Sequence, residues 1–300
     1  MKVLFLNHNY VGYGTYWRAF YLGKYLAKLG HEVTMVCASE KNLDFKVRKT
    51  KIDEKFYRVT LPRIKYSRYY TGQELRMFIS TLQSLVYKYD IIHCFTVAQP
   101  QVGIPGLFAK VFRKKKFVVD FDDLWSNGFT KYHSTLIRKI LNLCELKIPR
   151  FADKVTVVSD FLKKKVSAYL GSEEKIVKLP NGSNVDEIKP LDKYESRKAL
   201  GLNINDPIIV SLGHTYMKSF DFLINAFKKV TDEVPNAKLL IVGKIDLPLK
   251  SISPCKNVIF VDEQPFKKIP QYLSVADVLV LPMEDSSIAV SYTHLTLPTN

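Results

Sequence analysis

The chain has 300 residues, of which 47% are hydrophobic, and it carries a formal net charge of +16 at pH 7. This length suits one large or two ordinary α/β domains, so the chain is long enough to bury a sizeable core. No stretch approaches the roughly 20 apolar residues of a transmembrane helix, and the surplus positive charge indicates an anionic partner or simply a lysine-rich surface.

The basic clusters bear on the kind of partner, and the cysteines bear on the cellular compartment. The clusters at residues 113–116 and 163–165 have no interleaved aromatic residues, which argues against nucleic acid as a partner. Four cysteines lie far apart without CxxC spacing, so we expect buried thiols in a reducing compartment. The first strand is too short to be the apolar part of a signal peptide. We therefore expect a cytoplasmic protein, with peripheral contact to an anionic membrane left open.

Apolar runs of strand length alternate with helical stripes through the first half. A strand at residues 2–6 precedes a loop at 7–14, which holds Gly12 and Gly14. Their G-x-G spacing lacks the third glycine of a dinucleotide fingerprint, which would fall at Trp17, so these glycines indicate a turn or a close approach to a ligand. The other strands and helices predicted for this half are at 19–29, 32–36, 56–61, 75–85, 90–94, 103–112, 116–121, 136–148, 154–158, 161–169 and 175–179.

Two stretches of this half carry more than secondary structure. Leu75, Phe78, Leu82 and Leu85 recur at helical spacing and form one apolar stripe. Residues 63–72 are aromatic and basic and read as a loop, which is either a packed surface loop or a contact for an acceptor or a membrane.

An acidic cluster closes the strand predicted at residues 116–121. Asp120, Asp122 and Asp123 stand at its carboxyl end, where parallel sheets bind ligands. Carboxylates in D-x-D spacing can hold a divalent ion against a diphosphate, whereas aspartate is also a common helix cap. The sequence leaves a functional site and a capping role open, and we predict no metal ligand.

A domain boundary is predicted after the turn signal of Pro180, Asn181 and Gly182. The polar stretch at 183–194 follows it, and we place a first domain at 1–185 and a second at 186–290. Both read as Rossmann-like α/β domains, since strands and helices alternate throughout.

The second half opens with a strand–helix–strand unit. The strand at 208–212 ends at Gly213, a polar loop continues to residue 219, and a helical stripe and a strand at 239–242 follow. Because such a loop lies beside a helix N-terminus at the carboxyl edge of a sheet, we predict that it binds a phosphate-bearing ligand. A short helix predicted from 197–200 precedes this unit. The elements predicted after it are at 258–261, 266–275 and 277–281.

Four strings in this order, VTVVSDFLKKKV, KIVKLPNGSNVDEIKP, IIVSLGHTYMKSFDFLINAFKKV and YLSVADVLVLPMEDS, resemble family-4 glycosyltransferases of the GT-B fold. The resemblance runs from residue 1 to about 289 and is strongest in the second half. It implies a two-domain enzyme that binds a nucleotide-sugar mainly on its C-terminal domain. It also implies transfer with retention of configuration, an acceptor on the N-terminal domain, and no metal or cofactor, the nucleotide-sugar being a substrate.

The resemblance assigns donor contacts to the second half. Lys218 matches the lysine of the family's diphosphate clamp, while His214 stands where the arginine normally is and offers neither its full charge nor its fork. Glu284 matches the first glutamate of the E-x7-E signature, which lies beside the transferred sugar. Gly213 completes the donor-binding candidates of this half, and Asn181, at the end of the first domain, is a further one.

In the first half, Gly12 and Gly14 match the loop that approaches the donor. Asp122 and Asp123 lie where the family's N-terminal domain faces the cleft, and they are candidate catalytic or acceptor contacts together with Glu284. His93 resembles a histidine common at the end of its strand, although a satisfied structural histidine is the favoured interpretation.

The end of the chain departs from the family. The second glutamate of E-x7-E would fall at Tyr292, and residues 291–300 show neither strand nor helix patterning. They resemble a translated sequencing adapter, so we expect a non-native tail, an incomplete second domain and an unstable or inactive polypeptide.

The leading function is therefore a nucleotide-sugar-dependent glycosyltransferase acting on a glycan or a lipid-linked acceptor, in cell-envelope or polysaccharide synthesis. A nucleotide-sugar epimerase on the same architecture is the alternative enzyme. A further alternative, a basic and non-catalytic binding module, is supported by the net charge alone.

Overall fold

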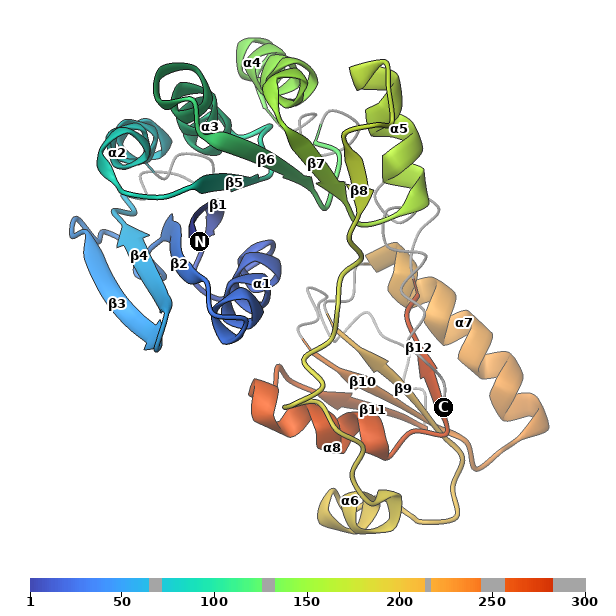
Figure 1. Cartoon of the computed structure of the whole chain (residues 1–300). Coiled ribbons are helices and arrows are strands. Elements are labelled where there is room, and N and C mark those ends of the chain that lie inside the picture. Colours follow the sequence, from blue (N-terminus) through green and yellow to red (C-terminus); the bar gives the residue numbers. More distant parts are fainter. Residues whose placement is uncertain (65–71, 126–132, 214–216, 244–256, 283–300) are drawn as a thin grey trace. The chain divides into compact units, whose positions relative to one another are not determined.

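The computed structural model describes residues 1–64, 72–125, 133–213, 217–243 and 257–282, and Figure 1 shows their elements. The chain divides into two compact units, of which the first covers Met1–Asn181 and the second begins at Gly182. Each unit has its own parallel sheet and its own apolar core. The predicted α/β class with two Rossmann-like units is confirmed. The domain limits stay predictions, and residues 283–300 lie outside the described ranges.

The first unit is built on an eight-stranded sheet in the order β3-β4-β2-β1-β5-β6-β7-β8. Neighbouring strands pair in parallel except β3, which pairs antiparallel with β4 at the edge. The strands are β1 (Lys2–Tyr10), β2 (Glu32–Ala38), β3 (Arg48–Asp53), β4 (Phe56–Leu61), β5 (Ile91–Phe95), β6 (Lys116–Phe121), β7 (Lys154–Val157) and β8 (Ile176–Lys178).

Helices cover both faces of this sheet, because its central strands are apolar on both sides. Val3 and Phe5 of β1 face a core shared with α1 (Tyr16–Lys28). Leu4 and Leu6 face the opposite core. That core is shared with α2 (Gln73–Val86), α3 (Pro100–Arg113), α4 (Thr135–Lys147) and α5 (Asp160–Leu170), which lie on one side of the sheet in Figure 1. A short 3-10 turn, η2 (Ile148–Phe151), follows α4.

The second unit has a parallel sheet in the order β11-β10-β9-β12. Two apolar clusters flank it, one of them shared with α7 and the other with α8. Its elements are α6 (Lys193–Ala199), β9 (Ile208–Leu212), α7 (Met217–Glu233), β10 (Lys238–Val242), β11 (Val258–Val261), η4 (Phe266–Lys268), α8 (Ile269–Ser274) and β12 (Val278–Val280). The predicted strand–helix–strand unit around Gly213 is therefore present.

Three features of the first unit differ from the sequence-based expectation. The strand β1 continues to Tyr10, so half of the predicted loop at 7–14 is sheet. The edge strand β3 was not predicted, because its sequence RKTKID is charged rather than apolar. The helix α2 forms as expected, but its apolar stripe points outward: Leu75, Phe78 and Leu82 are exposed.

Candidate functional site

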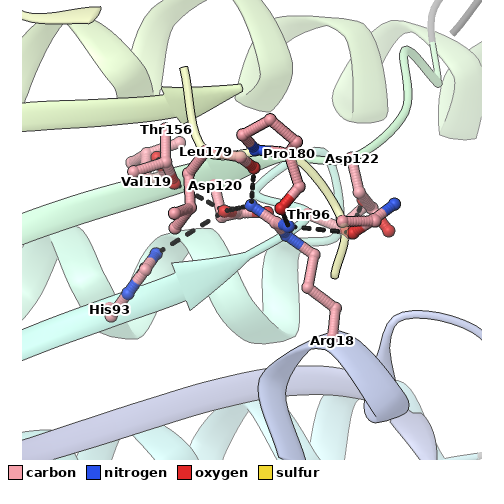
Figure 2. A network of polar contacts seen from close by, with 10 residues as sticks. Arg18, His93, Thr96, Val119, Asp120, Asp122, Thr156, Leu179 and Pro180 are labelled. Carbon is pink, nitrogen blue, oxygen red and sulfur yellow. Dashed lines mark hydrogen bonds and ion pairs between the residues drawn. The ribbon is translucent and has the colours of Figure 1, made fainter. Parts of the chain in front are cut away.

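Polar side chains gather at the carboxyl edge of the first sheet, where its parallel strands end (Figure 2). Arg18 of α1 reaches Asp120 of β6 with two hydrogen bonds of 2.9 Å, from Nε to Oδ1 and from Nη2 to Oδ2. The Asp120 side chain is fully buried and that of Arg18 is nearly so. This bidentate geometry is the strongest form of arginine–carboxylate pairing. It fixes one charged pair inside a largely apolar sheet.

The same guanidinium holds the segment that leads out of the first unit. Its Nη2 donates to the Leu179 carbonyl at 2.8 Å, and its Nη1 donates to Asn181 Oδ1 at 2.8 Å and to the Pro180 carbonyl at 3.4 Å. Asn181, a predicted donor contact, is thus placed beside the acidic cluster. Its amide oxygen accepts the hydrogen bond from Arg18.

Two more strands contribute to the Asp120 surroundings. Thr156 of β7 donates its hydroxyl to Asp120 Oδ2, and His93 Nε2 of β5 lies 3.9 Å from the same oxygen. Burial lowers the pKa of His93 to about 4, against a smaller opposing effect of Asp120, so the ring is neutral at pH 7. Among the described residues His93 Nε2 has no hydrogen-bond partner. The expectation of a satisfied structural histidine is not met at this atom.

The surroundings of Asp122 raise the pKa of its carboxyl group far above the usual range. It is buried just beyond β6 and accepts a hydrogen bond of 3.2 Å from the Thr96 hydroxyl. Burial raises the pKa of Asp122 to about 8; Asp123 and Asp120 add to the rise, and Arg18 opposes it. A carboxyl group that is largely protonated at neutral pH can donate as well as accept a hydrogen bond. Thr96 holds the left-handed conformation at φ 64°, a strain typical of functional loops.

The other acidic residue, Asp123, adjoins Asp122 in the chain, and the glycine loop directly precedes α1, the helix that carries Arg18. Gly12 and Gly14 both have positive φ, and the Trp17 indole donates to the Gly12 carbonyl at 2.9 Å. A Cβ on Gly14 would lie 2.4 Å from Asn9 Nδ2, whereas the space beside Gly12 is open. The turn favours glycine at both positions because of φ, whereas the Asn9 side chain could move to admit a Cβ at Gly14.

In the second unit, Gly213 directly follows β9 and Gly243 directly follows the neighbouring β10. Both have positive φ, of 128° and 136°, and a Cβ on Gly243 would lie 2.2 Å from the Gly213 carbonyl oxygen. The Gly213 amide donates to the Val242 carbonyl at 2.9 Å. These contacts fix the start of the predicted phosphate-binding loop, and α7 begins a few residues later, at Met217.

Three candidates are not placed by the structure. His214 and Glu284 lie outside the described residues. Lys218 belongs to the first turn of α7, but its side chain also lies outside what the structure describes. In the described part of the chain, no group of three or more histidine, cysteine or acidic residues could hold a metal ion.

Sequence reasoning missed four residues of this arrangement. Arg18 and Thr156 are ordinary residues of a helix and a strand, and Thr96 lies in a loop without a motif. Gly243 directly follows the strand predicted at 239–242, where a glycine marks no more than a strand end. The available signal was a single arginine in an aromatic helical stretch, YWRAF, which faces the sheet edge.

Comparison with known proteins identifies the family. A family description, Glycosyltransferase Family 4, matches residues 14–187, and a second, Glycosyl transferases group 1, matches residues 206–294. The chain belongs to glycosyltransferase family 4. The two matches lie on the two units in the order that the resemblance implied.

Curated relatives share moderate identity over part of their length. An uncharacterized glycosyltransferase of Methanocaldococcus jannaschii is 30% identical over 47% of this chain and 35% of its own. A putative teichuronic acid biosynthesis glycosyltransferase of Bacillus subtilis, TuaH, is 25% identical over 61% and 47%. A GDP-mannose-dependent mannosyltransferase of Corynebacterium glutamicum is 28% identical over 45% and 38%. The chain spans less than half the length of these relatives.

Solved structures of similar fold cover nearly the whole chain. Sucrose-phosphate synthase of Thermosynechococcus elongatus has a TM-score of 0.69 at 18% identity, covering 95% of this family 4 chain and 77% of its own. The Anabaena protein HepE, in complex with UDP and glucose, has a TM-score of 0.61 at 17% identity, covering 93% and 73%. At such identities the likeness shows the fold alone, and that fold is GT-B, as predicted.

Proposed function

We propose that this family 4 protein transfers a sugar from a nucleotide-diphosphate sugar to a glycan or a lipid-linked acceptor. The observation that carries the proposal is the pair of neutral, buried groups at the carboxyl edge of the first sheet. Protonated Asp122 and the neutral ring of His93 each can donate and accept hydrogen bonds, as sugar hydroxyls do. Such groups suit a polyhydroxyl ligand better than a charged one.

The donor is proposed to bind the second unit. The Gly213 loop and the N-terminus of α7 supply the partial positive charge that favours a diphosphate. HepE was solved with UDP and glucose, and the Corynebacterium relative is named as GDP-mannose-dependent, so both uridine and guanosine donors are supported. Lys218, His214 and Glu284 are proposed donor contacts on the family resemblance, and Gly12, Gly14 and Asn181 are proposed from the first unit.

The chemistry proposed is a retaining transfer without a metal. Departure of the nucleoside diphosphate leaves negative charge, which the α7 N-terminus and Lys218 would stabilise in place of a cation. Asp122, Asp123 and Glu284 are the candidate catalytic groups. Among them, we assign Asp122 to a hydrogen bond with a hydroxyl of the reacting sugar or the acceptor, because its proton is retained near neutral pH.

The acceptor is proposed from what the relatives are named for. TuaH is named for teichuronic acid synthesis, and the Corynebacterium enzyme for a mannosyl transfer to a monoacylated phosphatidylinositol mannoside. These names support an envelope glycan or glycolipid as acceptor, and we propose that transfer takes place at the cytoplasmic face of a membrane.

The test is a transfer assay with a panel of UDP- and GDP-sugars and a lipid extract as acceptor. The wild-type chain should release nucleoside diphosphate and label the lipid fraction, which would also overturn the sequence-based expectation of an inactive polypeptide. Proton NMR of the product should show the donor's anomeric configuration retained. Asp122→Ala, which removes both the donor and the acceptor of the carboxyl group, should lower kcat by about 10²-fold or more, as loss of a transition-state hydrogen bond does, with little change in donor KM.

Asp232→Ala is the matched control, since it makes the same chemical change on an exposed residue of α7. Equal activity of the two variants would remove Asp122 from the mechanism. Interconversion of the sugar nucleotide without any acceptor would instead favour the epimerase, and no reaction with any donor would contradict the proposed function.

A further inference from the structure

The helix α2 exposes the side that its sequence pattern assigns to the core. Leu75, Phe78, Leu82 and Val86 follow one another along its exposed side. Its buried side carries polar residues instead, including Arg76, Ser80, Gln83 and Ser84. An amphipathic surface helix normally does the opposite. A row of four large apolar side chains in water is costly unless something covers it.

The neighbouring helix α3 continues this apolar surface. It packs directly against α2, and Arg113 at its end donates to the Tyr87 carbonyl at 2.6 Å just beyond the end of α2. Phe108, Val111 and Phe112 are exposed on α3, and the rings of Phe108 and Phe112 lie 5.2 Å apart. Two adjacent helices therefore present apolar side chains to solvent.

The helix α4, next to α3 in Figure 1 and in contact with it, has the same character. Leu136, Ile137, Ile140 and Leu143 are exposed, at the spacing of one helix side. Only Leu141, Cys144 and Glu145 of this helix are buried. We call the exposed side of α2, α3 and α4 the outer helix face.

Charge on the outer helix face has one predominant sign. Its helices contain two acidic residues, of which Glu145 is buried and Glu74 exposed. Exposed cations in these helices and in the turns that directly follow α2 and α3 are Lys88, Lys114, Arg138, Lys139 and Lys147, against one exposed acidic residue, Asp90, in the turn after α2. Large apolar side chains flanked by lysine and arginine match the interfacial zone of an anionic bilayer, where the apolar groups enter the acyl boundary and the cations meet the headgroups.

We propose that the outer helix face docks the protein onto an anionic lipid bilayer. Within the described ranges no helix has the length and apolarity to cross a membrane, so the docking is in the plane of the interface. A second copy of the chain fits less well, because a symmetric contact would bring Arg138 and Lys139 toward their own kind. The proposal supplies a means of reaching a lipid-linked acceptor, but it does not depend on sugar transfer.

The experiment is flotation of the 300-residue chain with phosphatidylcholine vesicles, with and without phosphatidylglycerol, in the absence of donor and acceptor. We expect binding to the anionic vesicles only. Phe78→Ser and, separately, the pair Arg138→Glu and Lys139→Glu should each weaken it. Since each basic residue near an anionic surface strengthens adsorption roughly fivefold, reversing two charges should weaken it about 25-fold or more.

Matched controls lie on α7 of the second unit. Phe222→Ser removes a phenylalanine that is 69% exposed, against 62% for Phe78. Lys228→Glu with Lys229→Glu reverses the same number of exposed charges. Both controls should bind like the wild type. The proposal is overturned if the chain does not float with anionic vesicles, or if the controls lose binding equally. It also fails if Phe78→Ser abolishes a dimer, seen by light scattering, in a protein without vesicle affinity.

Because no sugar is present, this result is separate from the outcome of the transfer assay. A chain that binds vesicles but transfers nothing would leave the docking face intact and contradict only the proposed function.

Discussion

At the scale of single residues, Arg18 is the best-connected group of the candidate site. It neutralises a fully buried carboxylate and also binds Asn181 and the last carbonyls before the chain leaves the first unit. Removing one partner of a buried pair leaves the other charge without compensation, which costs much more than the pair itself contributes.

We predict that Arg18→Ala destabilises the first unit by about 3–5 kcal/mol. Both tryptophans, Trp17 and Trp125, lie in this unit, so urea unfolding followed by their fluorescence reports on it. Arg138→Ala, on the exposed side of α4, should change stability little. The pair Arg18→Met with Asp120→Leu should recover much of the loss, and failure to recover would point to the carbonyl contacts instead of the ion pair.

Asp122 gives a prediction with a defined pH window. A carboxyl whose pKa is raised by folding binds its proton more tightly in the folded state. Its contribution to stability is therefore lost as pH rises from the unfolded value of 3.8 toward the folded value of about 8. Asp122→Asn cannot ionise and should gain stability over the wild type across this window, by up to about 1.4 kcal/mol for each pH unit.

Unfolding of Asp122→Asn and wild type at pH 4, 6 and 8, by tryptophan fluorescence, measures this difference. Histidine titration affects both proteins alike, so it cancels in the comparison. Asp232→Asn should show no pH-dependent difference. A constant offset between Asp122→Asn and wild type would mean that Asp122 is ionised in the folded protein.

The sequence located part of this site and missed its partners for a physical reason. Asp122 was predicted because acidic residues at the end of a strand form a local pattern, and parallel sheets bind ligands at that edge. Arg18 pairs with Asp120 across 102 positions of the chain, and no local pattern encodes such a contact. For Lys218, His214 and Glu284, the assigned roles stay predictions.

At the scale of elements, the period of the apolar residues predicted the position of the helices well. It was a poorer guide to the side of each helix that is buried. The stripe of α2 has a helical period, and the helix is present, but Leu75, Phe78 and Leu82 of the stripe are exposed while the buried residues of the helix are polar. Periodicity fixes the angle between apolar and polar sides, and only packing decides which one is covered. The charged edge strand β3 was missed for a related reason, since edge strands are often charged to prevent further pairing.

The ends of β9 and β10 offer a prediction about the phosphate-binding loop. A Cβ on Gly243 would overlap the Gly213 carbonyl oxygen at 2.2 Å, so Gly243→Ala must displace the backbone that begins the loop. We predict a loss of about 1–3 kcal/mol from strain, with binding of UDP or GDP weakened about tenfold. Chemical unfolding followed by circular dichroism and calorimetric nucleotide binding measure the two effects.

Gly201→Ala is the control for backbone strain alone. Gly201 also has positive φ, of 66°, but nothing lies within 4 Å of a Cβ placed there. This variant should lose roughly 1 kcal/mol and keep its nucleotide affinity. Unchanged nucleotide binding in Gly243→Ala would separate the Gly213 loop from the donor site.

At the scale of the whole molecule, the two-unit architecture was predictable and its functional division stays to be measured. Alternating strands and helices indicated two parallel sheets, and the structure has them. Each unit has its own apolar clusters, so a ligand held by one unit should stabilise that unit first. The donor is proposed to bind the second unit, which contains neither tryptophan.

This division predicts how a nucleoside diphosphate shifts thermal unfolding. At about 100 times its Kd, UDP or GDP adds roughly 2.7 kcal/mol to the unit that binds it. The transition seen by far-ultraviolet circular dichroism should therefore rise more than the one reported by Trp17 and Trp125. Gly243→Ala should remove the shift, whereas Arg18→Ala should lower the transition of the first unit, which tryptophan fluorescence reports and which also contributes to the circular dichroism signal. A shift confined to tryptophan fluorescence would place the nucleotide on the first unit, since only a ligand held there stabilises the surroundings of both indoles.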